Sequence, residues 1–418
     1  MSHQQLTIGL FGFGVVGEGL YRILQQTPAL KATIKKVCIK NPEKKRDAPA
    51  ELFTTDKNLL LNDPEINVIV EVINESEPAF EIISAALLNG KDAISSSKKM
   101  IAEHFSELLT LQQQTGRSFL YESSACASIP VIRNLEEYYD NDLLHSIKAI
   151  VNGSTNYILT KIFEERLNYN QALLQAQQLG FAETDPKLDV EGFDAVSKWS
   201  ILLAHAYGII EKPENLLFNG IQSIHAGDAK LALAKNQQIK LVAQAKKLQN
   251  GKVAAFVLPQ FVEQDDQLAF VKNEYNGIVI ESGFADKQFF YGKGAGSFPT
   301  ASAVLSDISA LRYGYKYEYK KLNHHQPLLL TDDFYLQVYV SFDDLELIPK
   351  DKFEWIEEWH AREERKYLSG VIHFNELKNK NWWKENNTSL IILPDPIIEN
   401  VEIRSLKKRS LELAGLTG

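Results

Sequence analysis

The sequence of 418 residues has few cysteines, no excess of basic residues and no long apolar stretch. Its two cysteines, Cys38 and Cys126, are too few for a disulfide framework, and neither belongs to a CxxC pattern that would hold structural zinc. No apolar run approaches the roughly 18 residues that a membrane-spanning helix needs. The first residues are polar and resemble neither a signal peptide nor a transit peptide. We therefore expect a cytoplasmic protein without a membrane segment.

Charge and composition exclude a further class of function. The 54 acidic residues outnumber the 45 basic ones, whereas a nucleic-acid-binding protein usually carries a basic face. Nucleic acid is thus not an expected partner, although a local basic site for a small anion is compatible with this balance. Hydrophobic residues make up 44% and charged residues 24% of the chain, as in ordinary globular proteins, and the length suggests two or three domains.

The first third of the chain alternates strands with helices. Short apolar runs predict strands, and an amphipathic stretch closed by Gly90 predicts a helix over 78–89. This alternation is typical of a doubly wound parallel sheet, which makes the fold class α/β. The strands are expected at 6–11, 33–39, 66–73, 92–95 and 118–122.

Later segments have fewer helices between their strands, which favours an α+β region with a mostly antiparallel sheet. Alternating tyrosines predict a further strand over 312–321. The last segment has two strand-like runs on either side of a charged helix expected over 352–367, and it is interpreted as a small separate α+β domain. The other expected elements are strands at 145–151, 253–258, 277–281, 288–292, 334–342 and 389–393, and a helix at 301–311.

A glycine motif, GxGxxG, follows the first strand and opens a helix, which is the context that dinucleotide binding requires. Its first glycine permits a tight turn, its second lets the backbone approach a pyrophosphate, and its third lets the helix pack on the strand. The phosphates would then lie at a helix N-terminus, where free N–H groups favour negative charge. A purely structural glycine turn is the alternative. The motif consists of Gly12, Phe13, Gly14, Val15, Val16 and Gly17.

The end of the second strand predicts which dinucleotide binds. Sites that prefer NAD usually place an acidic residue here to hold the ribose hydroxyls, but this chain has Lys40 and Asn41, followed by Lys44, Lys45 and Arg46. Cations at this place suit a 2′-phosphate, so NADP is favoured over NAD. A solvated basic loop is the other interpretation.

An acidic segment precedes a strongly apolar helix. Beyond Gly192 a helix is expected in which Asp194 and Lys198 lie four residues apart on one face. The plain alternative is a surface ion pair, which contributes a few tenths of a kcal/mol. However, the residues after Lys198 are apolar nearly all round, which indicates a buried helix. A lysine at its start is then expected at the floor of a cleft, where a carboxylate can orient it for proton transfer.

The stretch 176–198 resembles the characteristic segment of homoserine dehydrogenases, A-x3-G followed by D-P-x2-D-V-x-G-x-D-x3-K. Three other stretches resemble this family in order and spacing: 95–98 (SSSK), 151–158 (VNGSTNYI) and 292–307 (GKGAGSFPTASAVLSD). The resemblance covers residues 5 to 320. The defining positions of the long segment are Ala176, Gly180, Asp185, Pro186, Asp189, Gly192, Asp194 and Lys198.

The resemblance implies NAD(P)H-dependent interconversion of L-aspartate 4-semialdehyde and L-homoserine, on the route to threonine, methionine and isoleucine. Lys198 matches the family's acid/base lysine, Asp194 would hold it, and Lys98 would stabilise the developing alkoxide. The positions that match substrate ligands are Glu183, Asp189, Gly153 and Ser154, and those near the cofactor are Ser96, Lys98, Gly294 and Gly296.

The family also holds a monovalent cation, Na⁺ or K⁺, in the loop that corresponds here to 122–130. Glu122 would be a side-chain ligand, and Ala125, Ala127 and Ile129 would offer carbonyl oxygens. The family's usual glycines are replaced in this loop, so a positive φ there would be strained. Cys126 is interpreted as a small buried residue.

Three domains follow: a Rossmann-type cofactor domain at 1–128, completed by about 297–322; a substrate and dimerisation domain at 129–296; and a divergent ACT-like domain at 325–418, without the usual effector turn. The resemblance also implies a homodimer.

The chain departs from the family pattern at three places: at Phe181, where Tyr is usual, at Asn74-Glu75, where G-G is usual, and at 95–97, where T-A-N is usual. A related amino-acid dehydrogenase with another substrate and a non-catalytic redox sensor are the alternative functions.

Overall fold

The structure is a computed structural model, and it describes residues 5–141, 143–323, 326–344, 346, 348–360, 366–384 and 388–403. The chain forms two compact units, each made of several stretches. The first unit comprises Met1–Asp142, Ser197–Pro213 and Gly292–Pro327, and the second comprises Leu143–Val196, Glu214–Tyr291 and Leu328–Gly418. The division into three domains at residues 128 and 325 thus stays a prediction.

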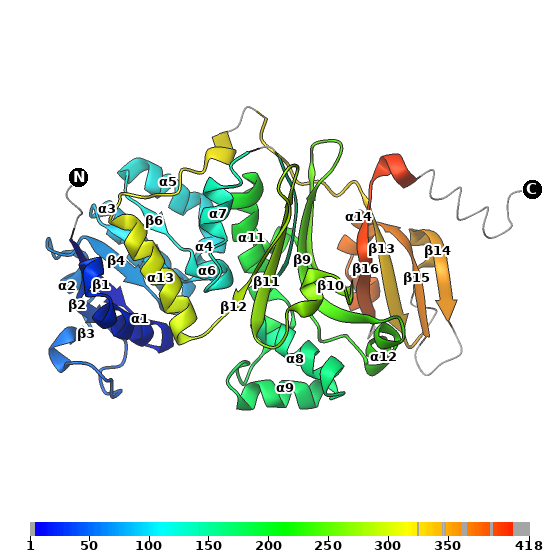
Figure 1. Cartoon of the computed structure of the whole chain (residues 1–418), viewed down its shortest axis with the longest axis horizontal. Helices are drawn as coiled ribbons and strands as arrows, with labels where there is room; N and C mark the ends of the chain where they lie inside the picture. The colour runs from blue at the N-terminus through cyan, green and yellow to red at the C-terminus, as the bar shows by residue number, and fades with distance from the viewer. Residues whose placement is uncertain are drawn as a thin grey trace, which may run out of the picture. The chain divides into compact units, whose positions relative to one another are not determined.

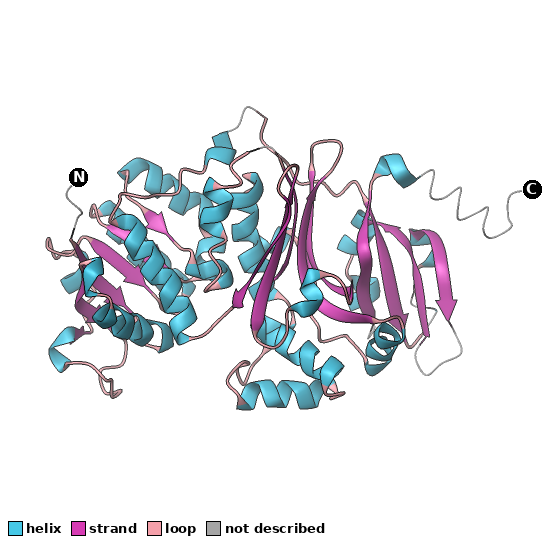
Figure 2. Ribbon diagram, in the orientation of Figure 1, coloured by secondary structure: helices cyan, strands magenta, loops and turns pink. Residues whose placement is uncertain are grey.

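The first unit is built on a parallel sheet with the strand order β3-β2-β1-β4-β5-β6 (Figures 1 and 2). Its central strands are apolar and buried, because helices cover a parallel sheet on both faces. The order reverses between β1 and β4, and ligands bind at such a switch point, beyond the carboxyl ends of the strands. The strands are β1 (Leu6–Phe11), β2 (Ala32–Cys38), β3 (Phe53–Thr54), β4 (Val68–Glu71), β5 (Asp92–Ser95) and β6 (Phe119–Leu120).

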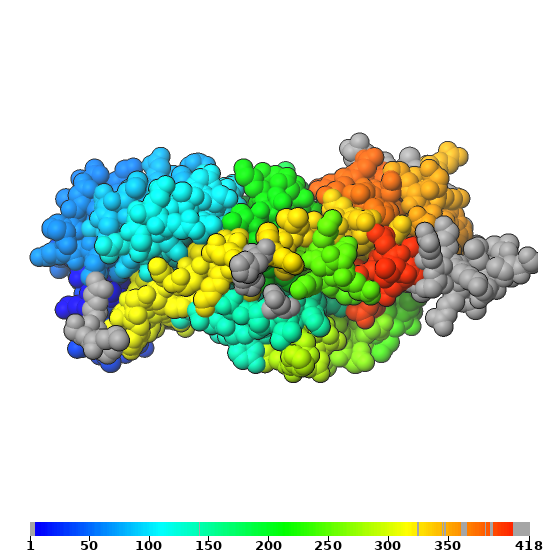
Figure 3. Space-filling model, turned by 90° about the horizontal axis from the view of Figure 1, so that it is seen from above, coloured from blue at the N-terminus to red at the C-terminus, as the bar shows by residue number. Residues whose placement is uncertain are grey.

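Helices of the first unit complete the doubly wound fold predicted from the sequence. Helix α13 packs along α1, and the space-filling view shows the yellow α13 segment against the blue start of the chain (Figure 3). The residues expected to complete the cofactor domain therefore do lie in this unit. Its helices are α1 (Val15–Gln26), α2 (Asn58–Leu61), α3 (Ser76–Leu88), α4 (Lys98–Glu103), α5 (Phe105–Thr115), α6 (Ser123–Cys126), α7 (Ile132–Glu137) and α13 (Ser297–Leu311), and α11 (Phe193–Tyr207) extends into it.

The second unit contains a larger, mostly antiparallel sheet, as expected for an α+β region. Within the described residues its strands follow the order β12-β11-β7-β9-β10-β16-β13-β15-β14, and β8 pairs with β10. The long strand β9 was not anticipated. The strands are β7 (Leu144–Ile150), β8 (Leu217–Phe218), β9 (Gln237–Lys247), β10 (Val253–Glu263), β11 (Tyr275–Ser282), β12 (Asp286–Lys293), β13 (Tyr335–Phe342), β14 (Phe353–His360), β15 (Lys366–His373) and β16 (Ser389–Ile398).

The C-terminal strands share this sheet and a hydrophobic core with the middle of the chain. β16 pairs in parallel with β10, at Gln260 and Ile392. Phe256 and Leu258 of β10 belong to the same buried cluster as Phe334 of the C-terminal segment and Val338 of β13. The helices of this unit are α8 (Gly153–Glu164), α9 (Tyr169–Gln178), α10 (Lys187–Val190), α12 (Ala226–Ala234), α14 (Phe374–Lys378) and α15 (Asn381–Lys384).

Two expected elements are wrong. The charged helix predicted over 352–367 is replaced by strand β14 and the start of β15, which pair with each other. The strand predicted over 312–321 is an irregular segment, in which Tyr317 and Tyr319 are buried against other aromatic rings. No helix in the described part of the chain is both long and apolar enough to cross a bilayer.

Candidate active site

The glycine turn lies between β1 and α1. Gly12 adopts φ 96°, a left-handed conformation that favours glycine. A Cβ on Gly17 would lie 2.3 Å from the carbonyl oxygen of Gly12, whereas a Cβ on Gly14 would meet no atom within 4 Å. The turn is thus closed at its first and third glycines and open at its second, where the first N–H groups of α1 are available to an anion.

The other residues of this motif support the turn or face outward. Phe13 is buried, and its ring packs edge-on against Tyr21 and Phe53. Val16 is half-buried, and the side chain of Val15 is exposed although it is apolar. The turn therefore presents an open, partly apolar surface at the switch point of the sheet.

A cavity of about 490 Å³ lies at the carboxyl end of β2, and Lys44 and Arg46 are among its lining residues. The Arg46 guanidinium donates to the carbonyl oxygens of Lys44 and Asn41 at 2.6 and 2.7 Å, which fixes the loop. Lys40, by contrast, does not line the cavity: its ammonium lies 2.6 Å from the Glu75 carboxylate. The remaining lining residues are Ile39, Pro42, Ala48, Ala50, Phe53, Thr54 and Thr55.

The turn after β5 holds Ser96 and Lys98 at the same edge of the sheet. Ser96 donates its backbone N–H to the carbonyl oxygen of Glu71 at 3.1 Å, and Lys98 is the half-buried first residue of α4. Gly294 and Gly296 lie between β12 and α13, where Gly296 has φ 118°. All four residues belong to the first unit, although the predicted boundary at residue 296 had assigned Gly294 and Gly296 to the substrate domain.

In the second unit, Gly153 and Ser154 are the first residues of α8. A Cβ on Gly153 would lie 2.6 Å from the carbonyl oxygen of Glu274, so only glycine fits there. The Ser154 hydroxyl donates to the carbonyl oxygen of Phe181 at 2.5 Å. Both residues therefore lie at a helix N-terminus, where free N–H groups attract a carboxylate.

Asn152, which sequence reasoning missed, joins two of the predicted acidic residues. Its side-chain oxygen caps α8 by accepting from the N–H of Thr155 at 2.8 Å. Its side-chain amide donates to Asp189 at 2.7 Å and to Asp194 at 2.8 Å. The V-N-G run indicated a polar turn, but no local pattern shows that one asparagine holds two carboxylates from a segment about forty residues away.

The acidic segment is arranged around the start of α11. Asp194 and Lys198 are 9% and 7% exposed and lie one helical turn apart, so they do not form a surface ion pair. The following residues of α11, including Trp199 and Leu202, are completely buried, as predicted. Asp189 is half-buried in α10, and Glu183 is exposed in the loop before it.

The loop expected to hold a cation contains a positive φ at a residue other than glycine: Ala127 has φ 44° and ψ −104°. The Glu122 carboxylate is buried and accepts from the N–H groups of Ile132 and Arg133 at 2.8 and 3.0 Å, and the Arg133 guanidinium lies 3.4 Å away. Burial raises the pKa of Glu122 despite these bonds. Cys126 is buried, as expected.

The carbonyl oxygens predicted to bind a cation are those of Ala125, Ala127 and Ile129, and the carbonyl oxygen of Ile129 accepts from the N–H of Val131 at 2.9 Å. The described residues contain no cluster of three His, Cys, Asp or Glu side chains that could hold a metal ion.

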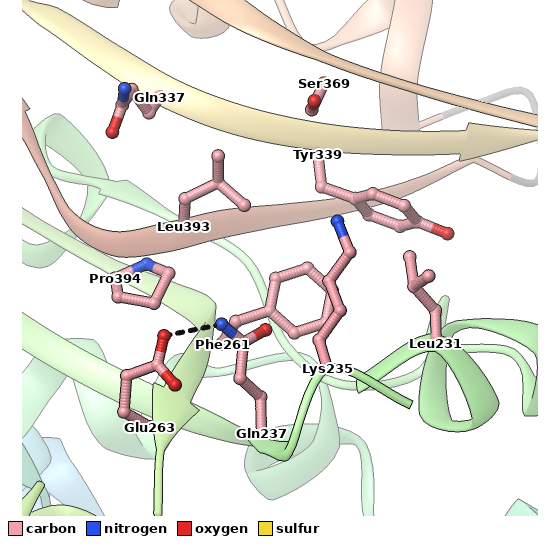
Figure 4. A pocket seen from close by; sticks show the side chains of 10 residues that line it. All are labelled: Leu231, Lys235, Gln237, Phe261, Glu263, Gln337, Tyr339, Ser369, Leu393 and Pro394. Carbon is pink, nitrogen blue, oxygen red and sulfur yellow. Dashed lines mark hydrogen bonds between the residues drawn. The ribbon is translucent and has the colours of Figure 1, made fainter. Parts of the chain in front are cut away.

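A second cavity, of about 320 Å³, lies in the second unit between α12 and the strands from β9 to β15. Figure 4 shows Phe261 and Tyr339 in its wall, and Gln237, which donates to Glu263 at 2.7 Å. None of the residues predicted to bind substrate or cofactor lines it.

Comparison with known proteins identifies the family. A family model described as homoserine dehydrogenase matches residues 130–309, and one described as the NAD binding domain of homoserine dehydrogenase matches residues 12–122. Homoserine dehydrogenase from Bacillus subtilis is 35% identical over 315 residues, 73% of this chain and 72% of the relative. The enzyme from Synechocystis is 37% identical over 311 residues, 72% of each chain.

Solved structures agree over a longer stretch. A homoserine dehydrogenase from Thiobacillus denitrificans has a TM-score of 0.81 at 25% identity and covers 93% of this chain and 98% of its own. A hyperthermophilic archaeal homoserine dehydrogenase mutant in complex with NADPH has a TM-score of 0.64 at 26% identity and covers 75% of this chain and 100% of its own. With family models over both catalytic parts and relatives above 30% identity, this chain belongs to the homoserine dehydrogenase family.

Proposed function

We propose that the protein catalyses the NAD(P)H-dependent interconversion of L-aspartate 4-semialdehyde and L-homoserine. The observation that carries this proposal is the arrangement at the start of α11. There Asp194 and Lys198 are buried one turn apart, and Asn152 holds Asp194 and Asp189 with one amide group. A buried lysine beside a fixed carboxylate is suited to proton transfer.

Each proposed residue has a defined task. When bound, the reduced nicotinamide supplies the hydride. Lys198 gives a proton to the carbonyl oxygen as the alcohol forms and takes it back in the reverse reaction, and Asp194 orients Lys198. Lys98 stabilises negative charge on the same oxygen. The substrate's carboxylate is bound at the N-terminus of α8, by Gly153 and Ser154, and its amino and hydroxyl groups by Glu183 and Asp189.

A variant of Lys198 tests this proposal. Lys198→Ala should lose turnover of homoserine by about 100-fold or more while it still binds NADPH, because the cofactor contacts lie elsewhere. Lys187→Ala is the matched control, since Lys187 is an exposed lysine of the same segment. Folded wild-type protein that binds NADPH but does not oxidise homoserine would instead leave another amino-alcohol as the substrate.

We further propose NADP as the preferred cofactor, bound over the glycine turn with its 2′-phosphate in the cavity lined by Lys44 and Arg46. The motif residues Gly12, Gly14 and Gly17 fit a pyrophosphate, and Ser96, Gly294 and Gly296 would contact the rest of the molecule. Lys44→Ala should weaken NADPH binding about tenfold and leave NADH binding unchanged, because one charged contact to phosphate is lost. Lys45→Ala, a change in the neighbouring lysine outside the cavity, should alter neither.

A monovalent cation, Na⁺ or K⁺, is proposed to bind the carbonyl oxygens of Ala125, Ala127 and Ile129. Glu122 would act beside it rather than as a free ligand, because its carboxylate is bonded to two N–H groups and Arg133. Activity in tetramethylammonium chloride should then fall below activity in KCl or NaCl at equal ionic strength. Equal activity in the three salts would argue against a bound cation.

We propose a cytoplasmic homodimer with cofactor (1–128 with 297–322), substrate (129–296) and ACT-like (325–418) regions. Cys38 and Cys126 are thiols and do not form a disulfide, as in proteins of reducing compartments. Exposed aromatic side chains of the β11–β12 hairpin, Phe284, Phe289 and Tyr291, support pairing through the middle of the chain. Light scattering should give twice the 47.2 kDa mass of one chain, and Phe284→Asp should shift this mass toward the monomer.

A further inference from the structure

A carboxylate that the proposed chemistry does not use is buried directly below the cofactor edge of the first unit. Glu71 is the last residue of β4 and is 0% exposed. In register it lies between Phe11 of β1 and Ser95 of β5. Its position is therefore at the switch point of the sheet, where buried charge is costly and calls for a physical reason.

Hydrogen bonds connect Glu71 to the turn that carries Lys98. One carboxylate oxygen accepts from the N–H of Ile73 at 2.6 Å, and the other accepts from the Ser95 hydroxyl. The Ser95 oxygen in turn accepts from the N–H of Ser97 at 3.0 Å. The ionised carboxylate thus fixes the direction of the Ser95 hydroxyl, and that hydroxyl fixes the backbone next to Lys98.

The two groups that donate to the Glu71 carboxylate, the N–H of Ile73 and the hydroxyl of Ser95, are both uncharged. The charged groups on the neighbouring elements are Lys98, Lys99 and Glu103 of α4, Glu77 and Glu81 of α3, Asp92 of β5, and Glu75 beyond β4. Lys99 is paired with Glu103, and Glu75 is paired with Lys40. Burial raises the pKa of Glu71 to about 7, against the lowering effect of the bonds from Ser95 and Ile73. The group therefore changes its charge near neutral pH.

We propose that Glu71 is a titratable positioning residue: its ionised carboxylate orders the turn from Ser95 to Lys98, and so places Lys98 for the reaction. When Glu71 is protonated, its new O–H donates to Ser95, the bond reverses, and the Ser95 hydroxyl must turn its hydrogen elsewhere. The bond from Ser97 then weakens and the turn loosens. This inference rests on the role proposed for Lys98.

The test compares four variants by steady-state oxidation of homoserine between pH 6 and 9. Glu71→Gln imitates the protonated state, because an amide N–H₂ also donates to Ser95. Its kcat at pH 8 should fall about tenfold, and it should lack the rise of kcat through pH 7 that we expect of the wild type, while KM stays within twofold. Ser95→Ala should behave alike, and Ser95→Thr, which keeps the hydroxyl, should retain the wild-type profile. Asp92→Asn is the control: it removes a carboxylate of raised pKa at the opposite end of β5.

Hydrogen exchange gives a readout that does not depend on the substrate. At pH 8 the peptide spanning residues 96–100 should exchange faster in Glu71→Gln than in the wild type. If the proposal is wrong, this peptide will exchange at the same rate in Glu71→Gln and in the control Asp92→Asn. A wild-type pH profile in Glu71→Gln, or unchanged exchange in this peptide, would overturn the inference. Absence of homoserine oxidation in the wild type would count against the proposed function alone.

Discussion

Single side chains make the proposed substrate site possible, and Asn152 illustrates how. Two acidic residues close together repel each other unless donors lie between them. The Asn152 amide bonds to both Asp189 and Asp194, while its oxygen caps α8. One uncharged side chain therefore holds the two carboxylates and the helix that is proposed to bind the substrate carboxylate.

Replacing this asparagine by aspartate separates its two tasks. Asn152→Asp keeps an oxygen that caps α8, but it replaces the amide donors with a third negative charge beside Asp189 and Asp194. We expect kcat/KM for homoserine to fall about 100-fold, as when a residue that positions reacting groups is lost, with little change in far-UV circular dichroism. Asn168→Asp, the same change at the N-cap of α9, should leave activity unchanged. Equal effects of the two changes would argue against the role of Asn152.

Glu71 also predicts how stability depends on pH. Its folded pKa of about 7 lies above the ordinary 4.5, so the folded state binds the proton more tightly than the unfolded state does. The contribution of this group to stability is therefore full below pH 4.5 and is lost as the pH rises to 7, a cost on the order of 3 kcal/mol. Glu71→Gln should then melt a few degrees above the wild type at pH 8 and at nearly the same temperature at pH 5. The exposed Glu81→Gln should show no such difference, and a lower melting temperature of Glu71→Gln at pH 8 would contradict the argument.

At the scale of elements, the sequence locates the apolar strands of the parallel sheet closely but misses β9, a buried strand whose lysines and glutamines conceal it. β1 and β5 were located to the residue, because a parallel strand is a continuous apolar run. β14 is an edge strand whose side chains are mostly half-buried, so charges and tryptophans mimic a helix there. The alternating tyrosines suggested a strand, but Tyr317 and Tyr319 do not belong to a sheet. Their rings pack around His205 instead.

The loop between β6 and α7 stores backbone strain at one residue. Ala127 has φ 44°, a conformation that costs a residue with a Cβ about 1 kcal/mol or more. Ala127→Gly should remove this cost and raise the melting temperature by a few degrees, less what the freer unfolded chain gives back. Ala125→Gly is the comparison, since Ala125 lies in α6, where glycine is unfavourable. A gain in stability from both changes would mean that φ is not the cause.

At the scale of the whole chain, order in the sequence does not match order in space. Helix α13 is close to three hundred residues from α1, yet Ser297 donates to the carbonyl oxygen of Val15 at 2.7 Å. The resemblance to a family indicated such a completion of the cofactor region, but no periodicity did. Likewise, the sequence suggested a separate C-terminal domain, whereas its strands continue the sheet of the second unit. Long-range pairing of this kind leaves no local pattern.

Removal of the C-terminal segment should therefore destabilise the rest of the second unit. A chain that ends at residue 327 would expose the edge of β10 and its buried residues Phe256 and Leu258. We expect it to aggregate on expression, because an uncovered apolar edge strand pairs with other chains. A chain that ends at residue 403 keeps all the described strands and should stay soluble and active. A soluble, active chain of 327 residues would show that β10 does not need this cover.

The shared core of β10 and the C-terminal strands also limits how such proteins exchange parts in evolution. A regulatory domain joined by a flexible linker can be exchanged between genes by recombination, since few contacts cross its boundary. Here the boundary between the two stretches lies in the middle of a sheet, and Phe256 packs against Phe334 across it. A recombinant that borrows the C-terminal strands from a relative will have to borrow β10 with them, so the two stretches should be inherited together.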